Sequence, residues 1–192
     1  MTTRQLDTAD GKDAGSSADP DAFDPRYRLD VVALNTADVV RYAGGWLFDR
    51  VMAGWSVTVF VQDAADPRPL RILGVDTGDL ESVLETRRHG TYPHTVAVES
   101  DLYSSDMRIR NGVHAALGHQ PTEVTLWGDR IPAELDSDLR NVQHRLSLAA
   151  RAFKAHALAA AGAPETGVAA TETFCTGRLS QPRVRSDLLP AG

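Results

Sequence analysis

The 192-residue chain is long enough for one hydrophobic core and has the composition of an ordinary soluble globular protein. Its formal net charge of −6 argues against a general nucleic-acid binder, which needs a concentrated basic face. No apolar run approaches the roughly 18 residues of a membrane span, and the first residues lack the apolar core of a secretion signal, so we expect a cytoplasmic protein. The single cysteine, Cys175, excludes an internal disulfide and a cysteine-based metal cage.

The two ends of the chain differ in composition from the middle. Residues 1–26 are rich in Asp, Ser, Gly and Thr and cannot bury enough apolar surface to offset the entropy of ordering, which predicts a disordered acidic tail. Residues 163–192 are rich in Ala, Gly, Thr and Pro and predict a flexible C-terminal tail. We therefore expect one folded core over residues 27–162.

Apolar runs alternate with amphipathic stretches along this core. Four short apolar runs predict strands, at residues 29–34, 57–61, 95–98 and 123–127. Three amphipathic stretches predict helices, at residues 36–55, 105–118 and 133–161. Strands separated by such helices predict an α/β fold with a mostly parallel sheet and flanking helices.

Several acidic residues follow the predicted strands, where the crevice of an α/β fold lies. They are Asp63, Asp76, Glu99, Asp101 and Asp129. One hypothesis is that they form a Mg²⁺ or nucleotide site. The alternative, which we favour, is that they form turns and cap helices, as Asp commonly does after a strand.

No phosphate-binding or metal-binding motif is intact. A phosphate loop needs glycines and a lysine after the first strand, but residues 33–39 contain no glycine and no lysine occurs between Lys12 and Lys154. The pair His114 and His119 is five residues apart, whereas zinc pairs on a helix are four apart. We therefore expect no cofactor and no metal.

The predicted helix at residues 133–161 carries apolar residues at steps of three and four. Such a stripe is typical of a helix packed on its own sheet. The alternative is a helix that binds a protein partner. Its candidate partner-binding residues are Leu139, Val142, Leu146 and Phe153.

Taken in order, these segments resemble the core of the RecA family of P-loop ATPases. LDVVALN takes the place of the strand before the phosphate loop, and residues 57–80 resemble the stretch in which a strand ends in D-A, followed by D-P and L-G-V-D. SDMRIRNGVHAAL resembles the next helix, EVTLWGD the strand that ends in the magnesium-associated acid, and LAAR the following helix. The resemblance covers about residues 29–161 and implies a RecA-like three-layer sandwich.

Because the phosphate loop is missing, the resemblance implies a RecA-like protein that has lost its ATPase activity. Asp63 and Asp129 would be remnants of the catalytic and metal-side acids of an inactive ATPase. Degenerate RecA-like proteins act as accessory proteins in damage-induced mutagenesis, so the resemblance implies a non-catalytic adaptor in DNA damage tolerance that contacts an inactive Y-family polymerase homologue. Two alternatives stay open: a Mg²⁺- or nucleotide-dependent small-molecule enzyme that uses the strand-end carboxylates, and a regulatory module unrelated to DNA.

Overall fold

The computed structural model describes residues 27–63, 66–85, 93–118, 122–135, 139–164, 167–177 and 189–190. The strands in these ranges are β1 (Arg28–Asn35), β2 (Ser56–Asp63), β3 (Asp76–Asp79), β4 (Thr95–Glu99), β5 (Glu123–Trp127), β6 (Leu139–Arg145), β7 (Thr171–Gly177) and β8 (Leu189–Pro190). The helices are α1 (Thr36–Met52), α2 (Arg68–Ile72), α3 (Leu80–Glu85), α4 (Ser100–Ser105), α5 (Met107–Gly118) and α6 (Leu148–Ala160), with a 3₁₀ turn, η1, at Ala133–Leu135.

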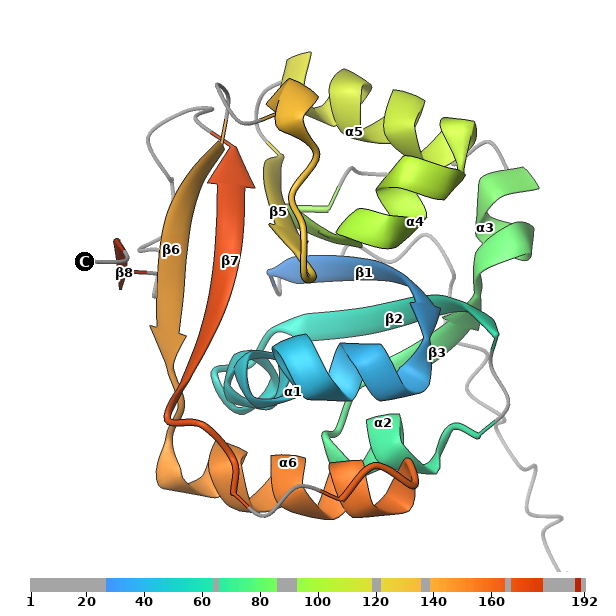
Figure 1. Ribbon diagram of the computed structural model, residues 1–192. Coiled ribbons are helices and arrows are strands. Elements are labelled where there is room, and N and C mark those ends of the chain that lie inside the picture. The colour runs from blue at the N-terminus through green and yellow to red at the C-terminus, as the bar shows by residue number, and fades with distance from the viewer. Residues whose placement is uncertain are drawn as a thin grey trace, which may run out of the picture.

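The strands form one mixed sheet in the order β3-β2-β1-β4-β5-β7-β6-β8. The first five strands in this order run parallel to one another. The last three are antiparallel to their neighbours. Helices α1, α2 and α6 cover one face of the sheet, and α3, α4 and α5 cover the other (Figure 1). Each face has its own cluster of buried apolar side chains. The predicted α/β class with a mostly parallel sheet and flanking helices is confirmed.

Helix α1 follows directly from local sequence signals. Asn35 caps it, with the side-chain oxygen Oδ1 accepting the backbone N–H of Asp38 at 2.9 Å. The apolar residues recur at helical spacing and are buried against the sheet. The paired glycines allow a close approach, because a Cβ at Gly45 would lie 2.5 Å from the methyl carbons of Leu146. The predicted helix is confirmed.

The predicted helix over residues 133–161 is wrong in its first half. Residues 139–145 form strand β6, and the helix begins only at Leu148, after the cap Ser147. Strand β6 pairs along its whole length with β7, from Leu139 opposite Gly177 to Arg145 opposite Thr171. The apolar residues of β6 happen to recur at helical spacing. The segment is nevertheless a strand because β7, which is distant in the sequence, pairs with it.

The segment expected as a C-terminal tail contributes a strand to the sheet instead. Strand β7 lies between β5 and β6, and its residues Glu172 and Phe174 are buried. Its sequence, TETFCTG, contains few apolar residues and gives little sign of a central strand. The predicted acidic tail at 1–26 lies outside the described residues. Within the part of the chain that the structure describes, no helix is long and apolar enough to cross a membrane.

Candidate functional site

The candidate site lies at the carboxyl ends of β1 and β4. From β1 the chain winds outward to β2 and β3, whereas from β4 it winds to β5 on the other side. The crevice at such a reversal of strand order is the usual ligand site of open α/β sheets. The topology therefore marks this edge of the sheet before any side chain is considered.

The first turns of α1 place three polar side chains at this edge. Asp38 accepts a hydrogen bond from the Asn35 amide nitrogen at 2.8 Å, and its other oxygen lies 3.8 Å from an Arg41 guanidinium nitrogen. The Tyr42 hydroxyl donates to Asp129, which follows β5, at 2.5 Å. This hydrogen bond is the main reason why the pKa of Tyr42 is raised to about 12. Helix α1 is thus tied to the end of β5 across the crevice.

Glu99, the last residue of β4, is a buried carboxyl group in the same place. It is 4% exposed, and its Oε2 accepts the backbone N–H of Leu34 at 2.6 Å. Burial raises the pKa of Glu99 above its usual value, and the nearby charges of Asp38 and Asp101 act in the same direction. A carboxyl group with a raised pKa in a crevice is a candidate for proton transfer.

We expect the variant Glu99→Gln to gain stability relative to the native chain as the pH rises. Because the folded-state pKa of Glu99 is raised, its stabilising contribution is fully present below the ordinary pKa and is lost as the pH rises through the folded value. Glutamine cannot ionise, so the variant keeps this stabilising contribution at high pH. Urea unfolding of both chains at pH 4 and pH 8 measures the effect. A difference in unfolding free energy that does not change with pH would contradict this prediction.

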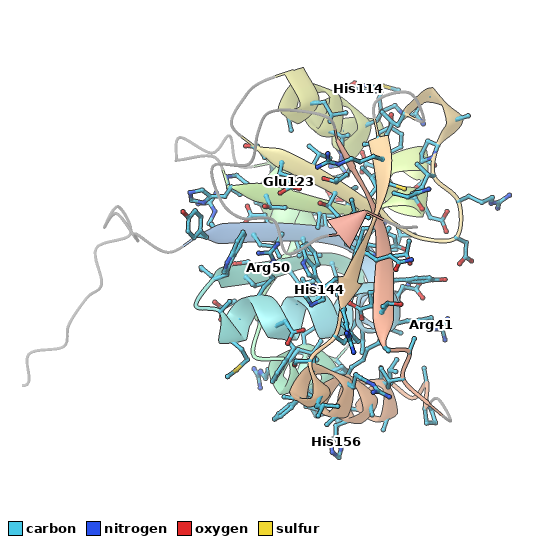
Figure 2. The ribbon with its side chains drawn as sticks, turned by 90° about the vertical axis from the view of Figure 1, so that its left-hand side faces the viewer. Arg41, Arg50, His114, Glu123, His144 and His156 are labelled. Carbon is cyan, nitrogen blue, oxygen red and sulfur yellow. The ribbon has the colours of Figure 1, made fainter. Side chains whose placement is uncertain are left out.

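A pocket of about 410 Å³ adjoins the crevice on the side of β7. Leu126 of β5 lies opposite Cys175, so the first residues of the antiparallel β7 run past the end of β5 and form a wall. Helix α1 supplies Arg41 and Tyr42 to the pocket, and Figure 2 shows Arg41 beside the β6–β7 pair. The other residues that line it are Leu126, Trp127, Gly128, Ile131, Asn141, Lys154, Ala169, Thr171, Glu172, Thr173, Phe174 and Cys175.

A buried ion pair between Lys154 of α6 and Glu172 of β7 fixes this wall to α1. The ammonium Nζ of Lys154 donates to Glu172 at 2.6 Å and to the backbone carbonyl of Arg41 at 2.5 Å. Glu172 also accepts the backbone N–H groups of Gly45 and Trp46 at 2.9 and 2.8 Å. In a regular helix the Gly45 N–H donates to the Arg41 carbonyl. Here the ion pair supplies partners to both groups, in the middle of α1.

The acids predicted from strand ends do not form one group. Glu99 and Asp129 reach the crevice, and Asp101 lies close to Glu99 in the first turn of α4. Asp63 lies opposite Asn35 in register but is exposed. Asp76 opens β3, so it lies toward the amino end of the parallel strands, away from the crevice.

Most of the groups around the pocket were not predicted from the sequence. Asp38, Arg41 and Tyr42 share one helix face directly after a strand, and this spacing was a usable local signal. The pair Lys154 and Glu172 joins residues whose contact with α1 spans more than 100 positions. No local pattern predicts such a contact.

The histidines do not converge. His89 and His119 lie outside the described residues, while the ring of His94 accepts the Arg28 N–H at the other end of the sheet. Figure 2 shows His114, His144 and His156 well apart. Among the residues that the structure describes, no group of three or more His, Cys, Asp or Glu side chains is arranged to hold a metal ion.

The four residues considered for partner binding do not share a helix face. Val142 and Leu146 belong to the hydrophobic core, and Leu139 packs at its margin. Phe153 is 44% exposed and stacks on Phe48, with 4.6 Å between ring centroids. Partner binding by these residues stays a prediction, although the expected shared helix face is wrong because Leu139 and Val142 lie on β6 and Leu146 follows it.

The fold is similar to that of several solved structures. No protein-family model and no curated protein sequence matches the chain. Among solved structures, it is similar to the A40926 pseudoaglycone deacetylase Dbv21, with a TM-score of 0.52 and 15% identity over 82% of this chain and 100% of that one. It is also similar to the conserved protein TT1542 from Thermus thermophilus, with a TM-score of 0.50 and 19% identity over 82% and 99%. A teicoplanin-bound deacetylase of the teicoplanin biosynthesis pathway gives 0.50 and 14% over 80% and 100%.

These neighbours overturn the RecA-like assignment. The order of strands and helices that carried the resemblance is common to many α/β sheets and does not identify one family. The LGVD stretch is the turn into the edge strand β3, and the acid of EVTLWGD, Asp129, binds Tyr42. The predictions that depended on the resemblance were wrong with it: a non-catalytic adaptor in DNA damage tolerance, a lost ATPase and the absence of enzyme activity.

Proposed function

We propose that the chain is a hydrolase that removes an acyl group from a polar small molecule bound at the carboxyl edge of the sheet. The observation that carries the proposal is the convergence of Asp38 and the buried Glu99 at the β1–β4 crevice, beside a pocket of about 410 Å³. The fold supports the choice of reaction, because Dbv21 and the teicoplanin-bound protein of similar fold are deacetylases.

The residues of the crevice fit the needs of amide hydrolysis. Asp38, half-exposed at the start of α1, accepts a proton from the attacking water as the water oxygen bonds to the acyl carbon. Glu99, which holds a proton more firmly than an ordinary Glu, donates it to the leaving nitrogen as the carbon–nitrogen bond breaks. Exchange with solvent then restores both carboxyl groups.

The test is the release of acetate from a panel of N-acetylated sugars and acylated glycopeptides, with and without added divalent ions. We expect Asp38→Asn and Glu99→Gln each to lower kcat/KM by about 100-fold or more, the usual size of a general acid–base contribution. Asp76→Asn, which removes an exposed carboxylate far from the crevice, is the control and should leave the rate unchanged. Acetate release that neither crevice variant affects, or no release from any acylated substrate, would refute the proposal.

A further inference from the structure

The pocket beside Tyr42 differs in chemistry from the acidic crevice next to it. We propose that this pocket binds a carboxylate of the substrate, so that the substrate is an acylated sugar acid or a similar acid rather than a neutral acylated sugar. The inference rests on the proposed function for the acyl chemistry. The binding claim itself concerns the pocket alone.

Several hydrogen-bond donors line the pocket. Arg41 and Lys154 bring positive charges, and the indole of Trp127 brings an N–H. The hydroxyls of Thr171 and Thr173 can also donate. Because Glu172 of the same lining offsets Lys154, Arg41 leaves the lining with one net positive charge in a chain whose net charge is −6.

The carboxylate and the side-chain amide oxygen of the lining are already engaged. Among the described residues that line the pocket, Glu172 is the only carboxylate, and its two oxygens accept the N–H groups of Gly45 and Trp46 and the ammonium of Lys154. The side-chain oxygen of Asn141 accepts the thiol of Cys175 at 2.9 Å. A ligand that carries its own acceptors therefore fits the donors of this lining.

One buried donor has no partner at all among the described residues. Trp127 is 1% exposed, and its indole nitrogen Nε1 makes no hydrogen bond there. An unpaired buried N–H costs free energy and is rare in folded proteins. Because Trp127 also lines the pocket, an acceptor on a bound ligand is a natural partner for this group.

Arg41 provides the charge and geometry that distinguish a carboxylate from a neutral acceptor. Its guanidinium can donate two parallel hydrogen bonds to one carboxylate. Its ion pair with Asp38 is long, at 3.8 Å, and partly exposed. Tyr42 lies between the pocket and the acidic crevice, because it lines the pocket while its hydroxyl donates a hydrogen bond to Asp129 of the crevice.

Two acids and their methyl esters test this inference: N-acetylmuramic acid and N-acetylneuraminic acid. The esters keep the sugar and the acetyl group but lose the charge. The full chain, labelled with ¹⁵N, is titrated with each compound while the indole N–H resonances are followed, and Trp127→Phe identifies the resonance of Trp127. We expect at least one acid to shift that resonance and to bind at least tenfold more tightly than its ester, with the Trp55 resonance unmoved.

Arg41→Gln should remove this preference for the acid. The matched control, Arg151→Gln, changes an exposed arginine of α6 that does not line the pocket and should keep it. Equal binding of acid and ester, or a Trp127 resonance that no acid shifts, would overturn the inference. Measuring acetate release in the same samples separates the two proposals: binding of the acid without release refutes only the hydrolase, and equally fast release from the esters refutes only the carboxylate pocket.

Discussion

Replacing Lys154 by methionine is expected to lower the free energy of unfolding by about 3–5 kcal/mol, the usual cost of removing one partner from a buried ion pair. Both side chains are almost fully buried, at 5% exposure for Lys154 and 3% for Glu172. The substitution leaves the Glu172 carboxylate without its cation and the Arg41 carbonyl without the ammonium donor. Urea unfolding at pH 7, followed by circular dichroism, measures the loss.

The size of this loss should depend on pH. Burial raises the pKa of Glu172 despite the opposing charge of Lys154, and removal of Lys154 raises it further. A raised carboxyl pKa contributes stability that is present at low pH and is lost as the pH rises through the folded value. The Lys154→Met variant is therefore expected to be closer to the native chain at pH 5 than at pH 8.

Two further variants separate the ion pair from general damage to the core. Lys154→Met combined with Glu172→Gln should recover part of the stability, because it removes the unpaired charge and keeps an acceptor for the α1 amides. Arg151→Met, on the exposed face of the same helix, should change the unfolding free energy by about 0.5 kcal/mol or less. A Lys154→Met chain within about 1 kcal/mol of the native chain would show that the pair does not fasten α1 to β7.

The sequence predicted those elements whose signals are local. Helix α1 has its cap at Asn35 and a stripe of apolar residues, and strands β1, β2, β4 and β5 are short apolar runs bounded by polar residues. Strands β6 and β7 escaped prediction because each depends on pairing with the other across about 30 residues. Their polar residues, including the buried Glu172 and His144, are tolerated because partners from other elements satisfy them.

The candidate site also contains a part that was predictable from local sequence signals and a part that was not. Glu99 and Asp129 were predictable from their positions at strand ends, because parallel strands bring such residues to one edge. The pocket was not, because its walls come from α1, β5, β6, α6 and β7, which only the completed fold brings together. The resemblance to the RecA family failed for a related reason: it relied on the order of elements, which fixes neither strand order nor the residues that meet.

Gly128 lines the pocket and directly precedes Asp129 of the acidic crevice. Its replacement by alanine is expected to lower the unfolding free energy by roughly 3 kcal/mol. Its φ is +132°, a conformation that favours glycine. A Cβ at this position would also overlap the hydroxyl of Ser100, which is fully buried. Both effects act next to Asp129, so we expect the bond from Tyr42 to Asp129 to weaken as well. Urea unfolding at pH 7 measures the loss.

A second substitution distinguishes backbone strain at Gly128 from the overlap. The Ser100 hydroxyl has no hydrogen-bond partner among the described residues, so Ser100→Ala alone should cost little. Combined with Gly128→Ala it should restore the part of the loss that is due to the overlap and leave the strain. Gly112→Ala, at an exposed helical glycine of α5 with open space around it, should instead stabilise the chain by about 1 kcal/mol. If both glycine variants changed stability in the same direction, the special role of Gly128 would be refuted.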